Sequence, residues 1–322
     1  MITMAEIARL THVSQPTVSR VLNGNPKVSP EIRERVLACA REHDYQLNAL
    51  AKGLKGSPTH LLGVLVTDIA NGFFADLTKQ IEICARERGY SIILFNSDYN
   101  PDNEQEYLDV VRRYRVDGVL AVPIRETSPQ WYDYVKRLDV PVVTITRRAT
   151  GLDSFYVDHP TAGGQVAAYL ADRGYRRFLF IGKEYDGKYV GFRQWLAEHG
   201  LGDVVTHQVL QNHDQFRQAL ERWLAESDLR AAVFAGNDIY ALQVLDILRE
   251  LQISVPAQVG VIGFDDTFMG QYLNPRLSTV RQPTAQMARQ AVNWLLDRIE
   301  HADASLPVQR AFSTELVLRE ST

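Results

Sequence analysis

A short polar stretch near the N-terminus carries side chains that can read the edges of DNA bases. Gln15 can pair with adenine N6 and N7, Thr17 with a base edge or a phosphate, and Arg20 with guanine or a phosphate. Ser14 is a suitable helix N-cap, and Pro16 falls in the first turn, where its missing N–H costs no helical hydrogen bond. These side chains therefore stand at the N-terminal end of a helix, the end that meets base edges in the major groove.

A second helix precedes this one and gives it a surface to pack against. In the run TMAEIARLTHVSQPTVSRVL, Thr3 and Glu6 have the spacing of a capping box, which predicts a helix from Met4. The chain breaks near residues 11–13, and the apolar positions on either side fall at helical spacing. The pattern predicts a DNA-binding helix-turn-helix, with an ordinary helical hairpin capped by polar residues as the alternative.

A third helix and a longer motif favour the DNA-binding interpretation. Ser29, Pro30 and Glu31 supply an N-cap, a proline at the first helical position and an acid in the first turn, so a helix is predicted through roughly His43. The run SQPTVSRVLNGNPKVSPEIRERVLACAREHDYQLNALAKGL resembles the lac-repressor (LacI/GalR) family of transcriptional regulators, whose VSxxTVSRVLNG core is specific. The resemblance continues through the rest of the chain and implies a repressor-type regulator.

The resemblance also implies which residues touch DNA. These are Thr3, Ser14, Gln15, Pro16, Thr17, Ser19, Arg20, Asn23, Asn48, Ala51, Lys52 and Leu54. In the family, a hinge helix folds when two copies pair in the minor groove, and Leu54 matches the leucine that wedges between base pairs there. Leu47 stands where the family usually has proline, and a plain flexible linker is the alternative for this segment.

Composition and charge are those of a globular protein with one end suited to DNA. The 322 residues are 45% hydrophobic and 23% charged, and no apolar run approaches the roughly 20 residues that a membrane span needs. No signal peptide is evident, and Cys39 and Cys84 fall at inward helical positions, so we expect a cytoplasmic protein, nucleoid-associated when DNA-bound, without a disulfide or a membrane partner. The net charge is −4, yet residues 1–60 hold eight Lys and Arg against five acids.

From Leu61 onward, apolar strands alternate with helices. Strands are predicted at 61–66, 91–96, 118–123, 141–146, 177–182, 204–210, 231–236 and 259–264, and as one more in the terminal run VQRAFSTELVLRE. Helices are predicted near 73–89, 101–115, 128–138, 187–199, 213–226, 237–251 and 283–300. Near-continuous apolar strands separated by helices indicate parallel sheets covered on both faces. The expected fold is a small all-α helix-turn-helix headpiece and an α/β body of two doubly wound parallel-sheet lobes, similar to periplasmic binding proteins.

These elements predict three parts of the chain. The helix-turn-helix headpiece spans 1–46, the hinge helix and linker 47–60, and an effector-binding and dimerisation domain 61–322. In the family the chain crosses between the lobes three times, which implies crossings near Asp158, Pro283 and Pro307. Residues of about 61–158 and 283–306 then form the first lobe, and about 159–282 and 307–322 the second.

Loops after the strands carry the side chains best placed to bind a small ligand, because ligands of such sheets bind at the carboxyl ends of the strands. Aromatic rings can cover the apolar face of a sugar, although the alternative for Phe73 and Phe74 is core packing. With the family motifs, this position implies an effector site made of Asp68, Phe73, Phe74, Thr146, Arg147, Lys188, Asn237 and Asp265. Asp238 and Asp266 are expected to be structural caps.

The charges of these loops indicate the class of effector. Lys188 and Thr146 stand where the family usually has arginine and often aspartate. Arg147, Arg148 and Lys188 offer three cations against two acids, and a lysine is a mobile charge that can reach a carboxylate or phosphate. A sugar acid or sugar phosphate is therefore expected, with a neutral sugar close behind and nucleosides or bases as further alternatives.

Other classes of function lack the residues they need. Catalysis requires a nucleophile with its base, paired carboxylates or a metal cluster, and the eight histidines are scattered apart from the loose pair His207 and His213. No enzyme activity, cofactor or metal is expected. An exported sugar binder would share the body but not the headpiece, and would need an export signal. We expect a homodimer on double-stranded operator DNA, without the leucine heptads that would join dimers into tetramers.

Overall fold

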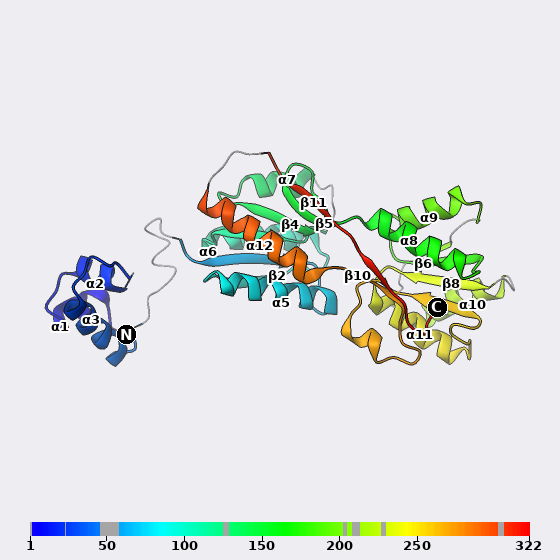
Figure 1. The fold of residues 1–322 in the computed structure, drawn as a ribbon, viewed down its shortest axis with the longest axis horizontal. Helices are drawn as coiled ribbons and strands as arrows, with labels where there is room; N and C mark the ends of the chain where they lie inside the picture. The colour runs from blue at the N-terminus through cyan, green and yellow to red at the C-terminus, as the bar shows by residue number, and fades with distance from the viewer. Residues whose placement is uncertain are drawn as a thin grey trace. The chain divides into compact units, whose positions relative to one another are not determined.

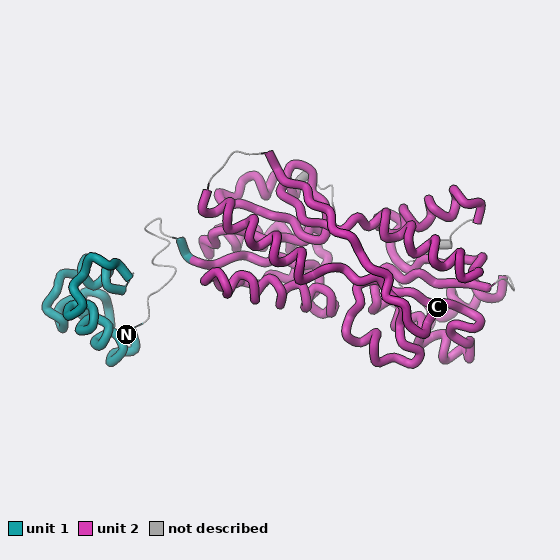
Figure 2. Tube along the Cα trace, in the orientation of Figure 1, with its two compact units in different colours: residues 1–59 teal, residues 60–322 magenta. Residues whose placement is uncertain are grey.

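The computed structural model describes residues 2–22, 24–45, 58–124, 129–201, 205–207, 213–226, 230–301 and 306–322. The chain divides into two compact units, residues 1–59 and 60–322 (Figure 2). Most of the predicted hinge lies outside the described residues, as do the predicted DNA contacts Asn23, Asn48, Ala51, Lys52 and Leu54. Among the described residues, no helix is long and apolar enough to cross a membrane.

The described part of the first unit is helical. Its helices are α1 (Met4–Leu10), α2 (Gln15–Leu22) and α3 (Pro30–Glu42). The predicted capping box is confirmed, because the Thr3 amide donates to Glu6 Oε2 (2.7 Å) and the Glu6 amide donates to Thr3 Oγ1 (3.3 Å). Ser29 Oγ accepts a hydrogen bond from the Ile32 amide at the start of α3, as its N-cap position predicts. The helices share one apolar core, formed by Ile7, Ala8, Val18, Val21, Val36 and Ala40.

The first lobe of the second unit is built on a six-stranded sheet in the order β11-β5-β4-β3-β1-β2, with every neighbouring pair parallel. Its strands are β1 (Leu61–Val66), β2 (Ser91–Asn96), β3 (Gly118–Ala121), β4 (Val142–Thr146), β5 (Asp153–Val157) and β11 (Gln309–Phe312). One face is covered by α5 (Gly72–Glu87) and α12 (Thr284–Glu300), the other by α6 (Pro101–Tyr114) and α7 (Pro129–Lys136). Both faces are buried, as the apolar strands predict.

The second lobe repeats this plan on a four-stranded parallel sheet in the order β7-β6-β8-β9. Its strands are β6 (Arg177–Ile181), β7 (Val205–His207), β8 (Ala231–Ala235) and β9 (Val259–Ile262). One face carries α8 (His159–Asp172) and α9 (Gly187–Glu198), the other α10 (His213–Ala225) and α11 (Asp238–Glu250). A short 3₁₀ helix, η1 (Phe268–Gln271), follows β9. Strand order reverses beside β1 in one lobe and β6 in the other, which marks the carboxyl ends of these strands as ligand sites.

Within the described residues, the chain passes between the lobes after β5, after β10 (Thr279–Arg281) and after β11 (Figure 1). The last passage leads into β12 (Glu315–Val317), which pairs antiparallel with β10. Thr279 lies opposite Val317, and Arg281 lies opposite Glu315. Two of the passages therefore run side by side as a short ribbon.

The structure corrects the predicted outline at the C-terminal end. The last passage, predicted near Pro307, comes after Phe312, because β11 pairs in parallel with β5 of the first lobe. Residues 309–312 therefore belong to the first lobe rather than the second. The terminal run predicted as one strand forms two strands in different sheets, and the elements β5, α8 and β10 were not among the predicted ones.

Two glycines let α8 and α9 pack backbone against backbone. A Cβ atom at Gly163 would lie 2.0 Å from the Lys188 carbonyl oxygen, and one at Gly191 would lie 1.8 Å from the Pro160 carbonyl oxygen. No side chain larger than hydrogen fits at these distances. The close approach fixes the start of α8 against the start of α9, where charged residues of the second lobe are found.

We expect Gly163→Ala to destabilise the protein by about 1–3 kcal/mol, because the added methyl must push two backbones apart. Gly164→Ala is the matched control in the same helix, since a Cβ there meets nothing closer than 3.8 Å. That control should be neutral or stabilising by roughly 0.5–1 kcal/mol, because alanine favours helix over glycine. Thermal unfolding of the full chain compares the two, and equal melting temperatures would contradict this account of the helix contact.

Candidate functional site

The polar side chains predicted to read DNA lie on the outer side of α2 and at the start of α1. The exposed members of this set are Thr3, Ser14, Gln15, Pro16 and Arg20, and the partly buried ones are Thr17 and Ser19. On the other side of α2, Val18 and Val21 are buried in the core of the headpiece. Ser14 Oγ accepts a hydrogen bond from the Thr17 amide (3.3 Å), so it caps the helix as predicted. The core thus fixes which side of α2 can face a partner.

In the first lobe, the two predicted aromatic contacts lie in the apolar core. Phe73 and Phe74 begin α5, which Asn71 caps by accepting a hydrogen bond from the Phe73 amide (3.0 Å). Their rings meet edge to face with centroids 5.1 Å apart, and they are 5% and 7% exposed. Asp68, after β1, is partly buried and accepts a hydrogen bond from the Ala70 amide (2.9 Å). Both rings are therefore packed in the core, which was the alternative prediction for them.

Arg147 is held by the loop that follows β3. Its Nη1 donates to the carbonyl oxygens of Pro123 (3.1 Å) and Ile124. Glu104, buried on α6, accepts a hydrogen bond from the Ile124 amide (3.0 Å). Burial raises the pKa of Glu104 to about 7, although Ile124 and Arg147 act in the opposite direction. Thr146, directly before Arg147, adopts a φ of 70°, a rare value for a β-branched residue.

The Lys188 ammonium is occupied within the second lobe. Lys188 Nζ donates to the Gly236 carbonyl oxygen (2.6 Å), lies 3.5 Å from Asp186 Oδ2, and stands 4.4 Å from the centroid of the Phe264 ring. Asp186 caps α9 by accepting a hydrogen bond from the Lys188 amide (3.0 Å). Burial acts to raise the pKa of Asp186, but the Lys188 charge holds it below its usual value. Lys188, which was predicted to contact the effector, also neutralises Asp186.

A histidine that sequence reasoning missed lies beside this ion pair. His159 begins α8 directly after the first passage between the lobes, and its ring centroid is 5.8 Å from that of Phe264. Burial lowers the pKa of His159 to about 3, and the Lys188 charge acts in the same direction. The imidazole is therefore neutral at physiological pH and can donate one hydrogen bond and accept another. Its position next to Asp158, where the first crossing between the lobes was predicted, is the signal that could have found it.

Asn237 and Asp265 follow β8 and β9 at the same edge of the second sheet. Asn237 Oδ1 caps α11 by accepting a hydrogen bond from the Tyr240 amide (2.8 Å). Asp265 Oδ1 accepts a hydrogen bond from Gln282 Nε2 (2.7 Å), and Gln282 lies in the second passage. Burial raises the pKa of Asp265 to about 8, against the opposing effect of Lys188. A largely protonated Asp265 can donate a hydrogen bond to a ligand oxygen at neutral pH.

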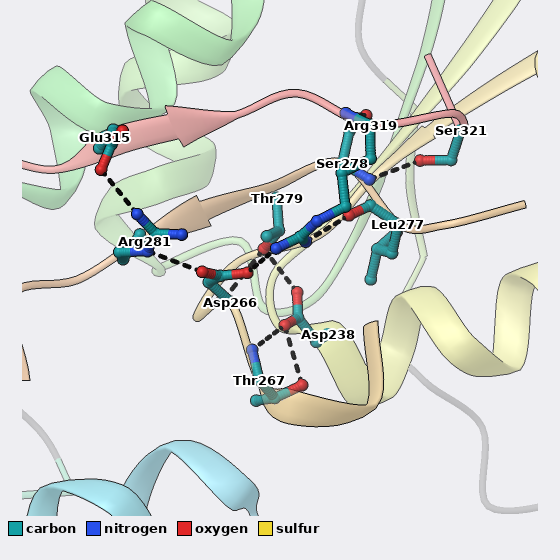
Figure 3. Close-up of polar contacts among 10 residues, drawn as sticks. All are labelled: Asp238, Asp266, Thr267, Leu277, Ser278, Thr279, Arg281, Glu315, Arg319 and Ser321. Atoms are coloured by element: carbon teal, nitrogen blue, oxygen red, sulfur yellow. Dashed lines mark hydrogen bonds and ion pairs between the residues drawn. The ribbon is translucent and has the colours of Figure 1, made fainter. Parts of the chain in front are cut away.

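Asp238 links α11 to the segment after β9 (Figure 3). Its carboxylate accepts hydrogen bonds from the Thr267 amide (2.6 Å), Thr267 Oγ1 (2.9 Å) and Thr279 Oγ1 (2.6 Å). Burial raises the pKa of Asp238 to about 6, while these hydrogen bonds act to lower it. Asp238 is structural, as expected, although it is a tertiary link rather than a helix cap.

Asp266 joins both strands of the interlobe ribbon (Figure 3). Its buried carboxylate pairs with Arg281 on β10 (2.7 Å) and with Arg319, just past β12. Arg281 also pairs across the ribbon with Glu315 (2.9 Å). Asp266 therefore connects two passages of the chain through its ion pairs with Arg281 and Arg319. It was expected to cap a helix, and this tertiary role is a correction.

One group of possible metal ligands lies on the surface of the second lobe. Its members are His213, Asp246 and Glu250, whose ligand atoms lie within 4.8 Å of one another. Arg249 pairs with Asp246 (2.5 Å), and Arg217 lies 3.8 Å from Glu250. Because these arginines already balance the carboxylates, we assign no metal site here.

Two family models match the chain. The model of bacterial regulatory proteins of the lacI family matches residues 3–48, and the model of the periplasmic binding protein-like domain matches residues 167–322. The first match covers the headpiece helices, and the second covers most of the second lobe together with the C-terminal elements of the first.

Relatives match over nearly the whole length. The chain is 32% identical to catabolite control protein A of Priestia megaterium over 304 residues, which is 91% of each protein. It is 31% identical to the ribose operon repressor of Escherichia coli (strain K12) over 335 residues, with 100% of both proteins covered. Among solved structures, the complex of the transcriptional regulator CelR with cellobiose aligns with a TM-score of 0.71 and 26% identity, over 100% of both chains.

The raised pKa of Asp265, about 8, makes stability depend on pH. Because the folded protein holds this proton more tightly than the unfolded chain, its contribution to stability is complete below about pH 4 and is lost as the pH rises through 8. We therefore expect the melting temperature of the wild type, relative to Asp265→Asn, to fall between pH 5 and pH 8. His159 acts oppositely, but only below about pH 6.5.

The matched control for this measurement is Glu106→Gln, which alters an exposed acid on α6. Thermal unfolding at fixed ionic strength should show no pH-dependent difference between this control and the wild type. A difference between wild type and Asp265→Asn that stays constant with pH would contradict the protonated state assigned to Asp265.

Proposed function

This chain belongs to the lacI family of bacterial regulatory proteins, and the relatives that it matches are DNA-binding repressors rather than enzymes. We propose that it represses transcription as an effector-controlled homodimer on a palindromic operator. The observation that carries the proposal is the outward set of polar side chains on α2, fixed by the buried Val18 and Val21. Its place of action is then the cytoplasm, where operator DNA lies.

Base recognition in this proposal falls to the N-terminal half of α2. Gln15 and Arg20 have the donors and acceptors to read base edges in the major groove, while Thr17 and Ser14 suit phosphate contacts that fix the register. The excess of three positive charges in residues 1–60 is modest, since eight Lys and Arg stand against five acids. Two headpieces on two half-sites would supply the affinity that one lacks.

The effector in this proposal is a sugar, sugar acid or sugar phosphate that binds between the lobes. The charges of Arg147, from the first lobe, and Lys188, from the second, both act on His159. The Lys188 charge also acts on Asp265. All four residues lie near the carboxyl ends of the strands. Neutral imidazole, protonated carboxyl and carboxamide groups are suited to hydroxyl groups. Relatives named as a ribose operon repressor and a cellobiose-bound regulator support a sugar-like ligand.

Control of DNA binding follows from linkage. An effector that binds one arrangement of the lobes better than another shifts the dimer toward that arrangement. The hydrogen bond from Gln282 to Asp265 joins the effector site directly to the second passage between the lobes. A coupling free energy of about 1–3 kcal/mol would change operator affinity roughly 5- to 150-fold.

Exposed apolar surface supports the proposed dimer. Phe268, Met269 and Tyr272, on and after η1, are 70%, 58% and 71% exposed, and the rings of Phe268 and Tyr272 lie 4.7 Å apart. On the first lobe, β2 is an edge strand that exposes 40% of Leu94. Apolar groups gathered in this way mark an interface, and a second copy of the chain is the partner that a palindromic operator requires.

Gln15→Ala should relax base preference at one position of each half-site by about 1–3 kcal/mol, because the bidentate contact with adenine is lost. Lys52→Ala, which alters a predicted phosphate contact, should weaken all duplexes alike and reduce the salt dependence. Selection from randomised duplexes, followed by fluorescence anisotropy on the selected operator, measures both effects. An unchanged consensus from Gln15→Ala would remove the assigned role of α2 in base recognition.

Phe268→Glu combined with Met269→Glu should shift the chain from dimer to monomer, because burying two carboxylates in an apolar contact is unfavourable. Light scattering would then report a mass near the 36.5 kDa of one chain. The control is Val190→Glu, which alters an exposed apolar residue of the same lobe on α9. A dimer that survives the double substitution, or one that Val190→Glu also breaks, would count against this interface.

A further inference from the structure

Two of the three cations expected to meet an anionic effector are committed to other partners. Lys188 Nζ neutralises Asp186 at 3.5 Å, and Arg148 Nε donates to Gln309 Oε1 (3.1 Å) at the edge of the first sheet. Arg147 remains, because it is partly buried directly after β4, whereas Arg148 is exposed, and because among the described residues it has no carboxylate within 4.0 Å. A second cation of this kind must therefore be sought near the same strand ends.

Lys183 is such a cation. It follows β6 by two residues, at the carboxyl edge of the second sheet. Its Nζ lies 5.5 Å from the centroid of the Tyr99 ring and 5.6 Å from that of Tyr185. Among the residues that the structure describes, Lys183 has no carboxylate within 4.0 Å, so its partners are two aromatic faces. Such contacts hold an ammonium in place without cancelling its charge.

Tyr99 brings this cation together with the first lobe. It follows β2, and both Asp98 and Tyr99 adopt a φ of 52°, a conformation that non-glycine residues adopt only when the surroundings enforce it. The Tyr99 amide donates to the Thr67 carbonyl oxygen (3.2 Å), which fixes the turn to the end of β1. Tyr99 as a whole residue is 39% exposed, so part of it faces solvent.

Several other groups of the site act electrostatically on the Tyr99 hydroxyl. Desolvation raises the pKa of its hydroxyl to about 12, and the charge of Arg147 acts to lower it. Asp68 and Tyr240 also act on this hydroxyl, which places groups from both lobes around it. Tyr99 therefore has Lys183 over its ring, and the charge of Arg147 acts on its hydroxyl.

We propose that Lys183, Tyr99 and Arg147 form a subsite for the anionic group, phosphate or carboxylate, of the effector that binds between the lobes. The inference rests on the proposed function, and it moves the anion from Lys188 to the residues that follow β2 and β6. Asp68 is the acid among the groups that act on the Tyr99 hydroxyl, whereas Glu104 and Asp186 are acids on which the Arg147 charge acts. An anion held there would contact both lobes at once and stabilise the arrangement in which they approach.

Matched pairs of ligands test the subsite on the full chain. The pairs are ribose with ribose 5-phosphate, glucose with glucose 6-phosphate, and glucose with gluconate. The last two pairs distinguish phosphate from carboxylate. Titration calorimetry should show that the anionic member of a pair binds more tightly. Lys183→Met should weaken that member about tenfold, as expected for loss of a charge-assisted hydrogen bond, and change the neutral member by less than about twofold. Lys183→Arg should retain the preference.

The chain offers a matched control for the loss of a lysine from a tyrosine face. Lys136 Nζ lies 4.2 Å over the Tyr132 ring at the C-terminal end of α7, away from the carboxyl ends of the strands. Lys136→Met should leave every affinity unchanged. If anionic members bind but Lys183→Met keeps their preference, or if neutral members alone bind, the subsite is refuted while the sugar effector stands. If no member of any pair binds, the proposed sugar-like effector fails, and the subsite fails with it.

Discussion

Asp266 is the charge on which the connection between the lobes depends. Its carboxylate is 5% exposed, and it holds Arg281 from one passage of the chain and Arg319 from the segment after another. Removing one partner of a buried ion pair leaves the other uncompensated, which costs far more than an exposed pair contributes. Asp238, beside it, binds Thr267 and so attaches the loop that carries Asp265 to α11. The ribbon and the effector loop are therefore positioned by one buried polar network.

This network also sets the charge of the candidate effector site. Burial beside Asp238 keeps Asp265 protonated at neutral pH, and burial beside Lys188 keeps His159 neutral. Lys188 and Asp186 cancel each other. The groups closest to the ribbon therefore present hydrogen-bonding capacity with little net charge, which suits hydroxyl groups. Lys183 stands apart from these groups, because its charge lies over the Tyr99 ring and, among the described residues, within 4.0 Å of no carboxylate.

Local sequence signals predicted local structure well, and long-range pairing poorly. The capping box of Thr3 and Glu6 was visible because both partners lie within one helical turn. β5 lacks a clear strand pattern because Asp153 and Ser154 interrupt its apolar run, and α8 lacks a clear helical pattern because of Gly163 and Gly164. The contact with α9 explains Gly163, whereas a Cβ at Gly164 would meet nothing closer than 3.8 Å. The commitment of Lys188 to Asp186, and the burial of Glu104, depend on the folded surroundings and have no signature in residue type alone.

The parallel pairing of β11 with β5 has a consequence for how the protein is made. On the ribosome, the strands β1 to β5 emerge first, but α12 and β11 follow all four strands of the sheet of the second lobe (Figure 1). Until then, the sheet has an unpaired edge at β5 and an uncovered apolar face where Met287, Val292 and Leu295 will pack. The first lobe thus cannot complete its fold ahead of the second, so the usual vectorial order of domain folding during translation does not apply to this body. A nascent chain stalled within the second lobe would expose the same edge and face to chaperones and proteases.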